Sequence, residues 1–530
     1  MTKIYHIQIS QDIKSKPAKQ LYSILEQLLP VKFLYSEQDG IEIEGAIIMD
    51  KGVNIYEISI PSLCLLLATD LENESEQKKT EVEFADDADV PFPFRGRRVS
   101  TKLTQVGSFL TVRNNEKILA STEQGAIWLV SEIGVTKYFR SALSLPHIST
   151  EQNFNDVFNG DCFLEMLVLL HFISVISLNI KYQPAPLRAS FIIDDPNLHW
   201  PKYGFVDYRE IVARAKKQNY HVSFATIPLD AWFTHTVTAE LFRTNSRWIS
   251  LLIHGNNHAK NELALNYSDA MRKGLLQQVI QRIKRMEQKA NISVCRVMVP
   301  PHGACSDEML AELSNSGFES ACISAGSLRF HNQDKLWVKT LGFFPAEMIH
   351  GFPVLPRWGL TGNVKSTLLI AAYLGQPMIL RGHHQDLKDG GDMFDEYANF
   401  INGLGDVFWS NMTDLSRLNY LWREEGTICR IKVLGNKILF QLPIEAIAVI
   451  IETPFTIDVV NWNVVTTNGY VYKIIPGELF LLCDEMGHLI LIERNDVCQP
   501  ISQKGVFKPT PKKLIFRRLL TETRDRLYWS

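Results

Sequence analysis

Two short strings in the sequence combine residue types that can hold a metal ion and activate water. Asp194 and Asp195 end one short apolar run, and His254 and His258 follow another. Adjacent carboxylates at the end of a buried strand repel each other and lose solvation, so they need a compensating cation. Neutral imidazole is a common protein ligand for zinc-like ions. Together the two strings indicate a hydrolase that activates water on a metal ion.

Each string also has a simpler interpretation when it is taken alone. Asp194-Asp195-Pro196-Asn197 is good turn chemistry, and a His-x-x-x-His spacing often arises by accident. Both strings, however, follow patterns typical of buried strands. Histidines at a strand end, downstream of a strand that ends in two acids, favour metal binding over an accidental spacing.

Two later segments add groups that suit the same chemistry. Residues 299–303 (Val-Pro-Pro-His-Gly) form either a loop whose backbone N–H groups face a developing oxyanion or a rigid loop without chemistry. Ser306 is the expected N-cap of the helix that follows. His383 and His384 follow another strand pattern. They are interpreted either as a general acid, because imidazole changes charge near neutral pH, or as a solvated surface pair.

In their order, these motifs resemble those of the polysaccharide deacetylases of the NodB-homology type, carbohydrate esterase family four. Asp194-Asp195 resembles the family's Asp-Asp motif, and residues 254–258 (HGNNH) resemble its His-Ser/Thr-x-x-His motif. Residues 300–303 resemble the end of its Arg-Pro-Pro-Tyr-Gly motif. The resemblance covers about residues 186–420 and is most specific in the first two motifs.

The resemblance implies a role for each matching residue and a fold that positions them. The implied fold is a distorted (β/α) barrel with the site at the carboxyl ends of its strands. Trp358 is interpreted as a residue that lines the substrate pocket. The implied roles are a catalytic base (Asp194), metal ligands (Asp195, His254 and His258), an oxyanion-binding amide in the loop of Pro301, His302 and Gly303, and a catalytic acid (His383, or else His384).

The chain departs from the family pattern at several motif positions. Val299 stands where the family has the arginine that orients the catalytic aspartate, which is Asp194 here, and Arg296 is the nearest substitute. His302 replaces the usual tyrosine, Gly255 replaces a hydroxyl residue and Pro196 replaces a glycine. The chain therefore resembles a divergent member, whose substrate need not be the family's usual one.

The surrounding sequence predicts an α/β protein with several parts, because 530 residues suffice for two to four domains. The parts are an N-terminal α/β domain of unknown role (1–150), a connecting helix and linker (151–186), a catalytic domain (187–420), a β-rich domain (425–503) and a basic tail (504–530).

Local patterns predict individual elements inside these parts. Residues 72–89 are acidic and polar, and they are expected to form an exposed loop. The apolar stretch 163–180 carries several polar residues and is expected to be a buried helix, not a membrane span. Further helices are expected at 18–29, 154–179 and 268–288, and strands at 4–9, 428–433, 437–442, 446–452, 456–460, 470–475 and 489–492.

Composition and the two ends of the sequence give expectations about partners and cellular location. The net charge of −3 predicts no nucleic-acid partner, and eight scattered cysteines without a pairing pattern suit a reducing cytoplasm. The first residues contain no apolar signal-peptide core, which also favours a cytoplasmic location. The tail has eight Lys/Arg against two acids from Lys504 to Ser530. It is expected to be either a helix docked on the protein or a basic helix that contacts an anionic membrane surface.

The function expected from these features is removal of an acetyl group from an N-acetylated sugar, such as a cytoplasmic intermediate of polysaccharide synthesis. Zinc is the preferred metal, and cobalt, iron and nickel also suit a His/His/Asp set. Two alternatives remain open. One is a related metal-dependent amidohydrolase or esterase that acts on a non-sugar acyl group, and the other is a catalytically inactive carbohydrate-binding protein.

Overall fold

The chain forms two compact units in the computed structural model. The first unit comprises residues 1–181, 336–343 and 361–373, and the second comprises 182–335, 344–360 and 374–530. The structure describes residues 3–10, 16–36, 40–50, 62–67, 78–103, 109–178, 181–453, 462–481, 489–494 and 511–529.

A nine-stranded mixed sheet is the main feature of the first unit. Its order is β2-β1-β3-β4-β9-β8-β7-β5-β6, and pairing changes from parallel to antiparallel after β9. The strands are β1 (Tyr5–Ile9), β2 (Val31–Leu34), β3 (Gly45–Met49), β4 (Leu63–Leu67), β5 (Lys78–Phe84), β6 (Arg98–Leu103), β7 (Lys117–Thr122), β8 (Gly125–Ile133) and β9 (Thr136–Ser141).

Four α-helices of the first unit lie within its described residues. They are α1 (Lys16–Leu28), α2 (Phe154–Val157), α3 (Leu164–Ile176) and α9 (Val364–Tyr373). Helix α3 is largely buried, as expected for the apolar stretch 163–180. The expectation of an exposed loop at 72–89 is wrong for residues 78–84, because alternation there places Val82 and Phe84 in the core of strand β5.

A ten-stranded sheet forms the centre of the second unit. Its strands are nearly continuously buried, as in parallel sheets covered on both faces. They are β11 (Arg188–Asp194), β14 (Val222–Thr226), β15 (Ile249–His254), β16 (Val294–Val299), β17 (Ser320–Cys322), β18 (Glu347–Ile349), β19 (Phe352–Leu355), β20 (Trp358–Gly359), β21 (Met378–Gly382) and β22 (Phe408–Trp409).

The strand order confirms an α/β organisation but not a closed barrel. The path runs β18-β19-β17-β16-β15-β14-β11-β21-β20, and all these pairs except β18·β19 are parallel. Among the described strands this path stays open. Its two ends are β18 and β20. Strand β19, the second in the path, is joined to β20 only by Pro356 and Arg357.

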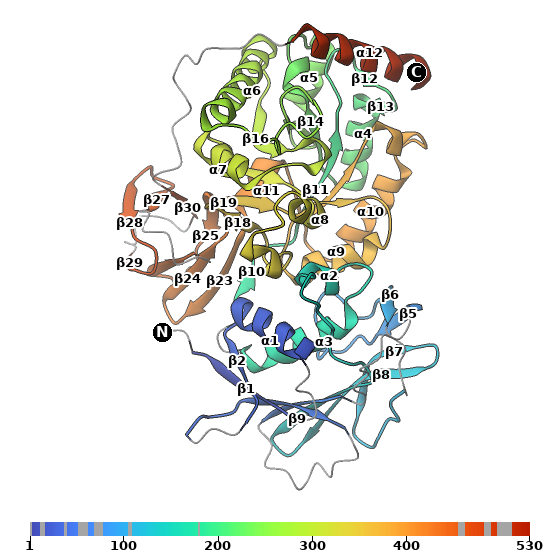
Figure 1. The fold of residues 1–530 in the computed structure, drawn as a ribbon, viewed down its shortest axis with the longest axis vertical. Coiled ribbons are helices and arrows are strands. Elements are labelled where there is room, and N and C mark those ends of the chain that lie inside the picture. Colours follow the sequence, from blue (N-terminus) through green and yellow to red (C-terminus); the bar gives the residue numbers. More distant parts are fainter. Residues whose placement is uncertain are drawn as a thin grey trace. The chain divides into compact units, whose positions relative to one another are not determined.

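Helices surround this sheet (Figure 1). The longest, α6, confirms the helix expected at 268–288, and its buried stripe includes Leu276 where the sequence suggested Leu275. Ser306 caps α7 as expected, because its side chain accepts a hydrogen bond from the Met309 amide. The helices are α4 (Tyr208–Gln218), α5 (Thr236–Thr244), α6 (Asp269–Ala290), α7 (Asp307–Asn315), α8 (Ala325–Phe330), α10 (Asp392–Asn402), α11 (Met412–Arg417) and α12 (Lys512–Trp529).

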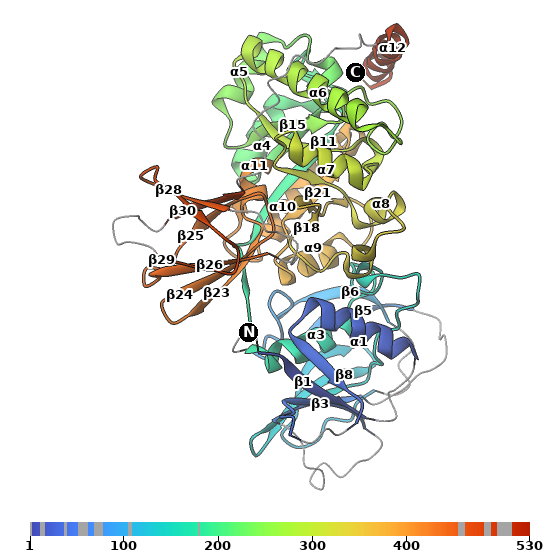
Figure 2. The same cartoon turned by 60° about the vertical axis from the view of Figure 1, so that its left-hand side comes forward.

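Two smaller sheets are formed mainly by the strands from β23 onward, which are drawn in orange and red in Figure 2, and β10 joins one of them from earlier in the chain. One has the order β10-β23-β24-β26-β29 and the other β25-β30-β27-β28. Their facing side chains share a core that includes Ile431, Phe440 and Trp462. The expected strand 456–460 lies outside the described residues. The strands are β10 (Gln183–Pro184), β23 (Tyr420–Glu425), β24 (Ile428–Val433), β25 (Lys437–Gln441), β26 (Ala448–Glu452), β27 (Trp462–Thr466), β28 (Val471–Ile474), β29 (Leu479–Leu481) and β30 (Leu489–Arg494).

Two further expectations concern membranes and thiols. Among the helices in the described ranges, none is long and apolar enough to cross a bilayer. The six cysteines within these ranges are free thiols. Most of them are buried, and burial raises the pKa of Cys64, Cys322 and Cys429 to about 12. They are therefore small core side chains and not reactive thiolates.

Candidate metal centre

The carboxyl ends of β11 and β15 bring one aspartate and two histidines together. Asp195 directly follows β11, His254 ends β15, and His258 lies four residues further on. His254 Nε2 is 3.3 Å and His258 Nε2 is 3.1 Å from Asp195 Oδ1. The three donor atoms all lie within 4.8 Å of one another. A carboxylate and two imidazoles in this arrangement fit a divalent ion such as zinc.

The hydrogen bond of His254 explains why a cation suits this cluster. His254 Nδ1 lies 2.9 Å from the carbonyl oxygen of Val299, which can only accept, so Nδ1 donates its proton there. In the neutral imidazole, Nε2 then carries a lone pair that faces the buried Oδ1 of Asp195. Two electron-rich atoms at this distance repel each other unless a proton or a metal cation lies between them. The bond to Val299 also keeps Nε2 turned toward the cluster.

Electrostatic interactions inside the cluster favour positive charge. Burial acts to raise the pKa of Asp195, but its contacts with His254 and His258 outweigh burial and hold this pKa well below the usual range. Burial acts to lower the pKa of His254, but the contact with Asp195 and the charge of Asp194 outweigh it and raise this pKa. The carboxylates therefore stabilise a cation at the position where a divalent ion would sit.

A buried carboxylate shapes the loop between the two histidines. Glu262 is 3% exposed and accepts hydrogen bonds from the backbone N–H groups of Asn256, Asn257 and His258 at 2.7 to 3.1 Å. Arg282 of α6 donates to the side-chain oxygens of Asn256 and Asn257. Hydrogen bonds to a charged partner contribute about 1.5–3 kcal/mol each. These bonds fix the second histidine without help from an ion.

Unusual backbone conformations accompany the ligands. Gly255 has φ of 60°, and a Cβ there would lie 2.5 Å from Glu262 Oε1 and 2.6 Å from Pro301 Cγ. This position therefore has no space for a side chain, which explains why it is glycine here and not the hydroxyl residue of the family that the motifs resemble. Asp195 and His258 also have positive φ, 81° and 53°. Positive φ is uncommon in residues other than glycine, and such residues cluster at functional sites.

Asp194, the proposed base, is held by an arginine that the sequence analysis did not identify. Arg357 Nη1 donates to both carboxylate oxygens of Asp194 at 3.1 and 3.0 Å, and both side chains are buried. Arg296, the substitute suggested by the sequence, does not take this place, because it pairs with Glu287 at 2.7 Å. The signal available in the sequence was an arginine directly after a short apolar run, in the link between β19 and β20.

The Pro-Pro-His-Gly loop lies beside the cluster. Pro301 and Gly303 are buried, whereas His302 is exposed and has φ of 57°. The rings of His302 and His258 meet edge to face with centroids 5.3 Å apart. Burial and the positive charges of His258 and His254 lower the pKa of His302. The structure thus brings the side chain of His302, and not only its backbone, next to His258, one of the candidate metal ligands.

The other expected site residues lie at the end of the sheet formed by β20 and β21. His383 directly follows β21, which pairs with β11, and it is half-buried. His384 is buried, and its ring packs against Tyr203 at 5.4 Å and Phe205 at 6.1 Å between centroids. Trp358 begins β20 and is half-buried. Of the two histidines, His383 is therefore the more accessible candidate acid.

The C-terminal helix reaches the backbone of the metal centre. Arg518 Nε lies 2.8 Å from a carboxylate oxygen of Asp230, and its Nη2 lies 2.6 Å from the same oxygen. Nη2 also donates to the carbonyl oxygen of Asp195 at 3.3 Å. Leu229 donates a backbone hydrogen bond to Asn256 at 3.0 Å, so the loop after β14 is tied to both ligand loops.

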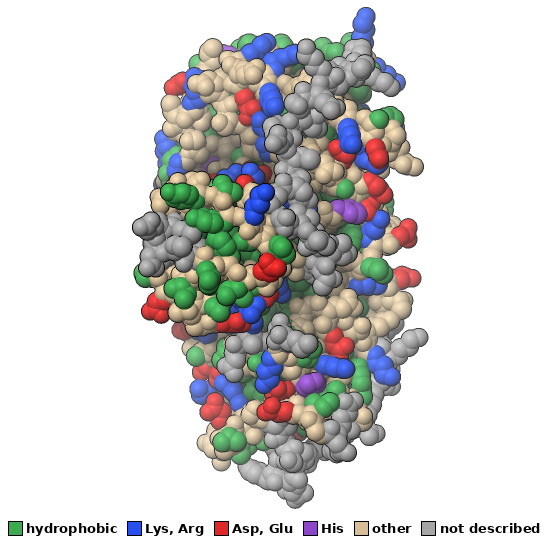
Figure 3. All heavy atoms as spheres, turned by 90° about the vertical axis from the view of Figure 1, so that its left-hand side faces the viewer, with side chains coloured by type: hydrophobic (Ala, Val, Ile, Leu, Met, Phe, Trp, Pro, Cys, Tyr) green, Lys and Arg blue, Asp and Glu red, His purple; other side chains and the backbone are tan. Residues whose placement is uncertain are grey.

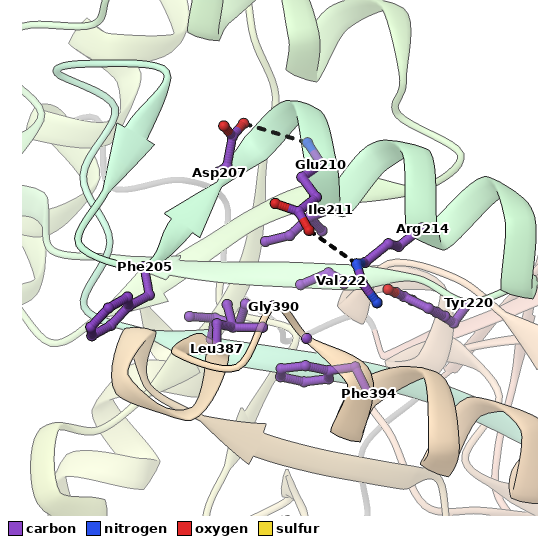
Figure 4. A pocket seen from close by; sticks show the side chains of 12 residues that line it. Phe205, Asp207, Glu210, Ile211, Arg214, Tyr220, Val222, Leu387, Gly390 and Phe394 are labelled. Carbon is purple, nitrogen blue, oxygen red and sulfur yellow. Dashed lines mark hydrogen bonds and ion pairs between the residues drawn. The ribbon is translucent and has the colours of Figure 1, made fainter. Parts of the chain in front are cut away.

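A small pocket lies elsewhere in the second unit (Figure 4). Its lining includes Glu210, Arg214, Tyr220 and Phe394, and its interior space of about 20 Å³ suffices for one water molecule. Arg214, one of the lining residues, forms ion pairs with Glu210 and Asp395. With this interior space, the pocket is not a candidate substrate site.

Comparisons with known proteins give distant structural likenesses. No protein-family model matches the sequence, and no curated protein matches it. The carbohydrate deacetylase Agd3 is 11% identical with a TM-score of 0.48, over 93% of this chain and 98% of Agd3. The peptidoglycan deacetylase PdaC from Bacillus subtilis is 14% identical with a TM-score of 0.27, over 44% of this chain and 91% of PdaC. BA3943, a CE4 family pseudoenzyme from Bacillus anthracis, is 13% identical with a TM-score of 0.27, over 44% of this chain and 66% of BA3943.

These identities and scores are low, so the functional argument rests on the geometry of the chain's own residues. A structural likeness of this kind concerns the fold, whereas function depends on the side chains of the site.

Proposed function

We propose that the chain is a metal-dependent hydrolase that removes an acetyl group from an N-acetylated sugar. The observation that carries this proposal is the convergence of Asp195, His254 and His258, with a second buried carboxylate on the neighbouring Asp194. The motif order that resembles the NodB-type polysaccharide deacetylases supports a sugar as substrate, with an intermediate of polysaccharide synthesis as the proposed class.

The donor set defines what a metal ion would contribute. Asp195, His254 and His258 would hold a divalent cation, with zinc as the preferred ion. Such an ion supplies Lewis acidity, because it polarises an acyl carbonyl and makes water a better nucleophile at neutral pH.

The chain's own residues would move the protons. Asp194 accepts the proton of the attacking water, and Arg357 orients its carboxylate for this role. The backbone N–H of His302 stabilises the developing oxyanion. His383 protonates the nitrogen as the C–N bond breaks, so that water and the amide yield acetate and a free amine.

An acetate-release screen tests the proposal most directly. The full chain, loaded with zinc, is assayed on N-acetylated sugars, on acylated non-sugar amines and on acyl esters. We expect release from the sugars, and we expect Asp194→Asn to reduce the rate about 100-fold or more while metal binding persists. Glu287→Gln, at the distant pair with Arg296, is the matched control and should keep the rate.

Three results would contradict parts of the proposal. Full activity of the Asp194→Asn protein would remove Asp194 from the role of base. Release only from non-sugar substrates would favour the related amidohydrolase or esterase. A protein that retains no stoichiometric zinc, measured by elemental analysis, would favour an inactive carbohydrate-binding protein.

A further inference from the structure

Helix α12 presents a strip of large apolar side chains to solvent. The exposed fractions are 43% for Ile515, 63% for Phe516, 49% for Leu519 and 55% for Leu520. Residues at i, i+1, i+4 and i+5 share one side of an α-helix. Surface hydrophobic residues that occur singly are normal, but a contiguous group of this kind marks an interaction surface.

The same helix carries a separate strip of positive charge. Lys513 and Arg517 recur at i and i+4, so they lie together along one edge of the apolar strip. Both are exposed. Lys512 lies within the apolar strip at the first turn, where its long stem allows the ammonium group to reach past the apolar side chains. An apolar strip bordered by Lys and Arg is typical of helices that lie in a membrane interface.

The third side of α12 attaches it to the second unit and determines which way the apolar strip faces. Arg518 binds the carboxylate of Asp230 and the carbonyl oxygen of Asp195, and its side chain is only 11% exposed. Leu514 and Thr521 lie on the same side of the helix and are half-buried. Because this side is held against the protein, the apolar strip points to solvent and not into a core.

The loop that Arg518 holds carries exposed aromatic rings of its own. Trp232 is 60% exposed and Phe233 is 44% exposed, two and three residues after Asp230. Their ring centroids are 5.8 Å apart. Tryptophan is enriched where proteins meet the headgroup layer of a bilayer, because its ring is apolar and its N–H is polar.

From these features we propose that α12 and the loop 231–233 bind an anionic phospholipid surface and hold the metal centre beside the bilayer. The positive charge of α12 favours this occupant over a second copy of the chain. A symmetric contact through α12 would bring the same positive strip of two copies together, whereas anionic headgroups neutralise it. Resting on the proposed function, the substrate would be an acetylated glycan presented at a membrane.

Vesicle co-sedimentation of the zinc-loaded full chain tests the proposal. We expect binding to vesicles of phosphatidylcholine with phosphatidylserine, much weaker binding to phosphatidylcholine alone, and loss of binding at high salt. The variant Ile515→Ser, Phe516→Ser, Leu519→Ser, Leu520→Ser should bind at least about 10-fold more weakly. Replacing Lys513 with Gln should weaken binding about 5-fold, which corresponds to about 1 kcal/mol per basic side chain.

A matched control uses apolar residues elsewhere in the second unit. Leu479 and Leu481 of β29 are 50% and 62% exposed. Figure 3 shows apolar side chains gathered on the face of the molecule that carries this strand. The variant Leu479→Ser, Leu481→Ser should bind vesicles like the unaltered chain. Acetate release from a soluble acetylated sugar should be the same in all these variants, because none of the changed residues belongs to the metal centre.

Three outcomes would overturn the proposal. They are no binding to anionic vesicles, equal loss of binding in the β29 control, and an α12 variant that converts a dimer to a monomer in sedimentation velocity while vesicle binding persists. The two proposals fail separately. A chain that releases no acetate but still needs the apolar strip for vesicle binding would refute the enzymatic function and support the membrane surface.

Discussion

Replacing Arg357 with Met should both destabilise the second unit and lower the proposed acetate release. The side chains of Arg357 and Asp194 are 3% and 4% exposed, so the substitution leaves a buried carboxylate without its cation. Removing one partner of a buried ion pair costs about 3–5 kcal/mol of unfolding free energy. A base displaced by about 1 Å costs on the order of 100-fold in rate, so we expect at least that loss of acetate release.

The assay combines denaturant unfolding with hydrogen–deuterium exchange at the β11 amides, since exchange reports the stability of this sheet separately from the first unit. Arg296→Met is the matched control. Its pair with Glu287 is 25% and 21% exposed, so its loss should cost less than about 1 kcal/mol and leave the rate unchanged. The double variant Arg357→Met, Asp194→Asn should recover much of the stability without any activity, because it removes the unpaired charge together with the base.

Equal unfolding free energies for the Arg357→Met and Arg296→Met proteins, together with an unchanged rate, would show that the Arg357 guanidinium neither neutralises nor orients Asp194.

Three further predictions concern the metal loop and the first unit. Glu262→Gln weakens the acceptor of the backbone N–H groups of the loop between the two histidines. We expect zinc affinity, measured by chelator competition, to fall about 10–100-fold. A zinc affinity equal to that of the unaltered chain would refute the anchoring role of Glu262. Gly255→Ala should weaken zinc binding, because the new Cβ would meet Glu262 Oε1. The control is Gly426→Ala, since Gly426 also has a positive φ, of 63°, but has no neighbour within 4 Å of a new Cβ. The Gly426→Ala protein should lose stability but still bind zinc. His171 is buried with its pKa lowered to about 4 by burial, so between about pH 4 and 6.5 the unfolded chain binds a proton there that the folded chain does not. The first unit should therefore lose up to about 3 kcal/mol of unfolding free energy as the pH falls through this window, and His171→Leu should flatten this dependence in hydrogen–deuterium exchange of α3. An equally steep dependence in the His171→Leu protein would show that His171 is not its source.

Residue type and position relative to strand ends were sufficient to predict which residues would converge. The carboxyl ends of parallel strands meet at one edge of a sheet, so Asp195 and His254 had to lie near each other once β11 and β15 were assigned. Residues 255–259 form an irregular loop. The left-handed conformation of His258 in this loop depends on Glu262, a contact that spacing alone does not reveal.

The features that the sequence did not reveal depend on long-range contacts or on mixed patterns. Arg357 and Asp194 are 163 positions apart, and an arginine in an apolar context carries no local sign of its partner. Strand β5 was missed because its exposed Glu81 and Glu83 dominate the composition, while the alternation with Val82 marks the buried face. A distorted (β/α) barrel was expected from the resemblance, whereas the pairing among the described strands leaves β19 and β20 unpaired with each other and forms no closed barrel.

The link between β19 and β20 has a consequence for how such chains are detected from sequence. The positive charge that holds the first aspartate arrives through Arg357, from a turn that follows the two prolines by more than fifty positions. A linear signature that demands a guanidinium immediately ahead of those prolines meets Val299 and passes over the chain. A signature written as a spatial arrangement of charges around the two aspartates would detect this chain. It would also detect any other chain in which the arginine comes from a neighbouring strand end.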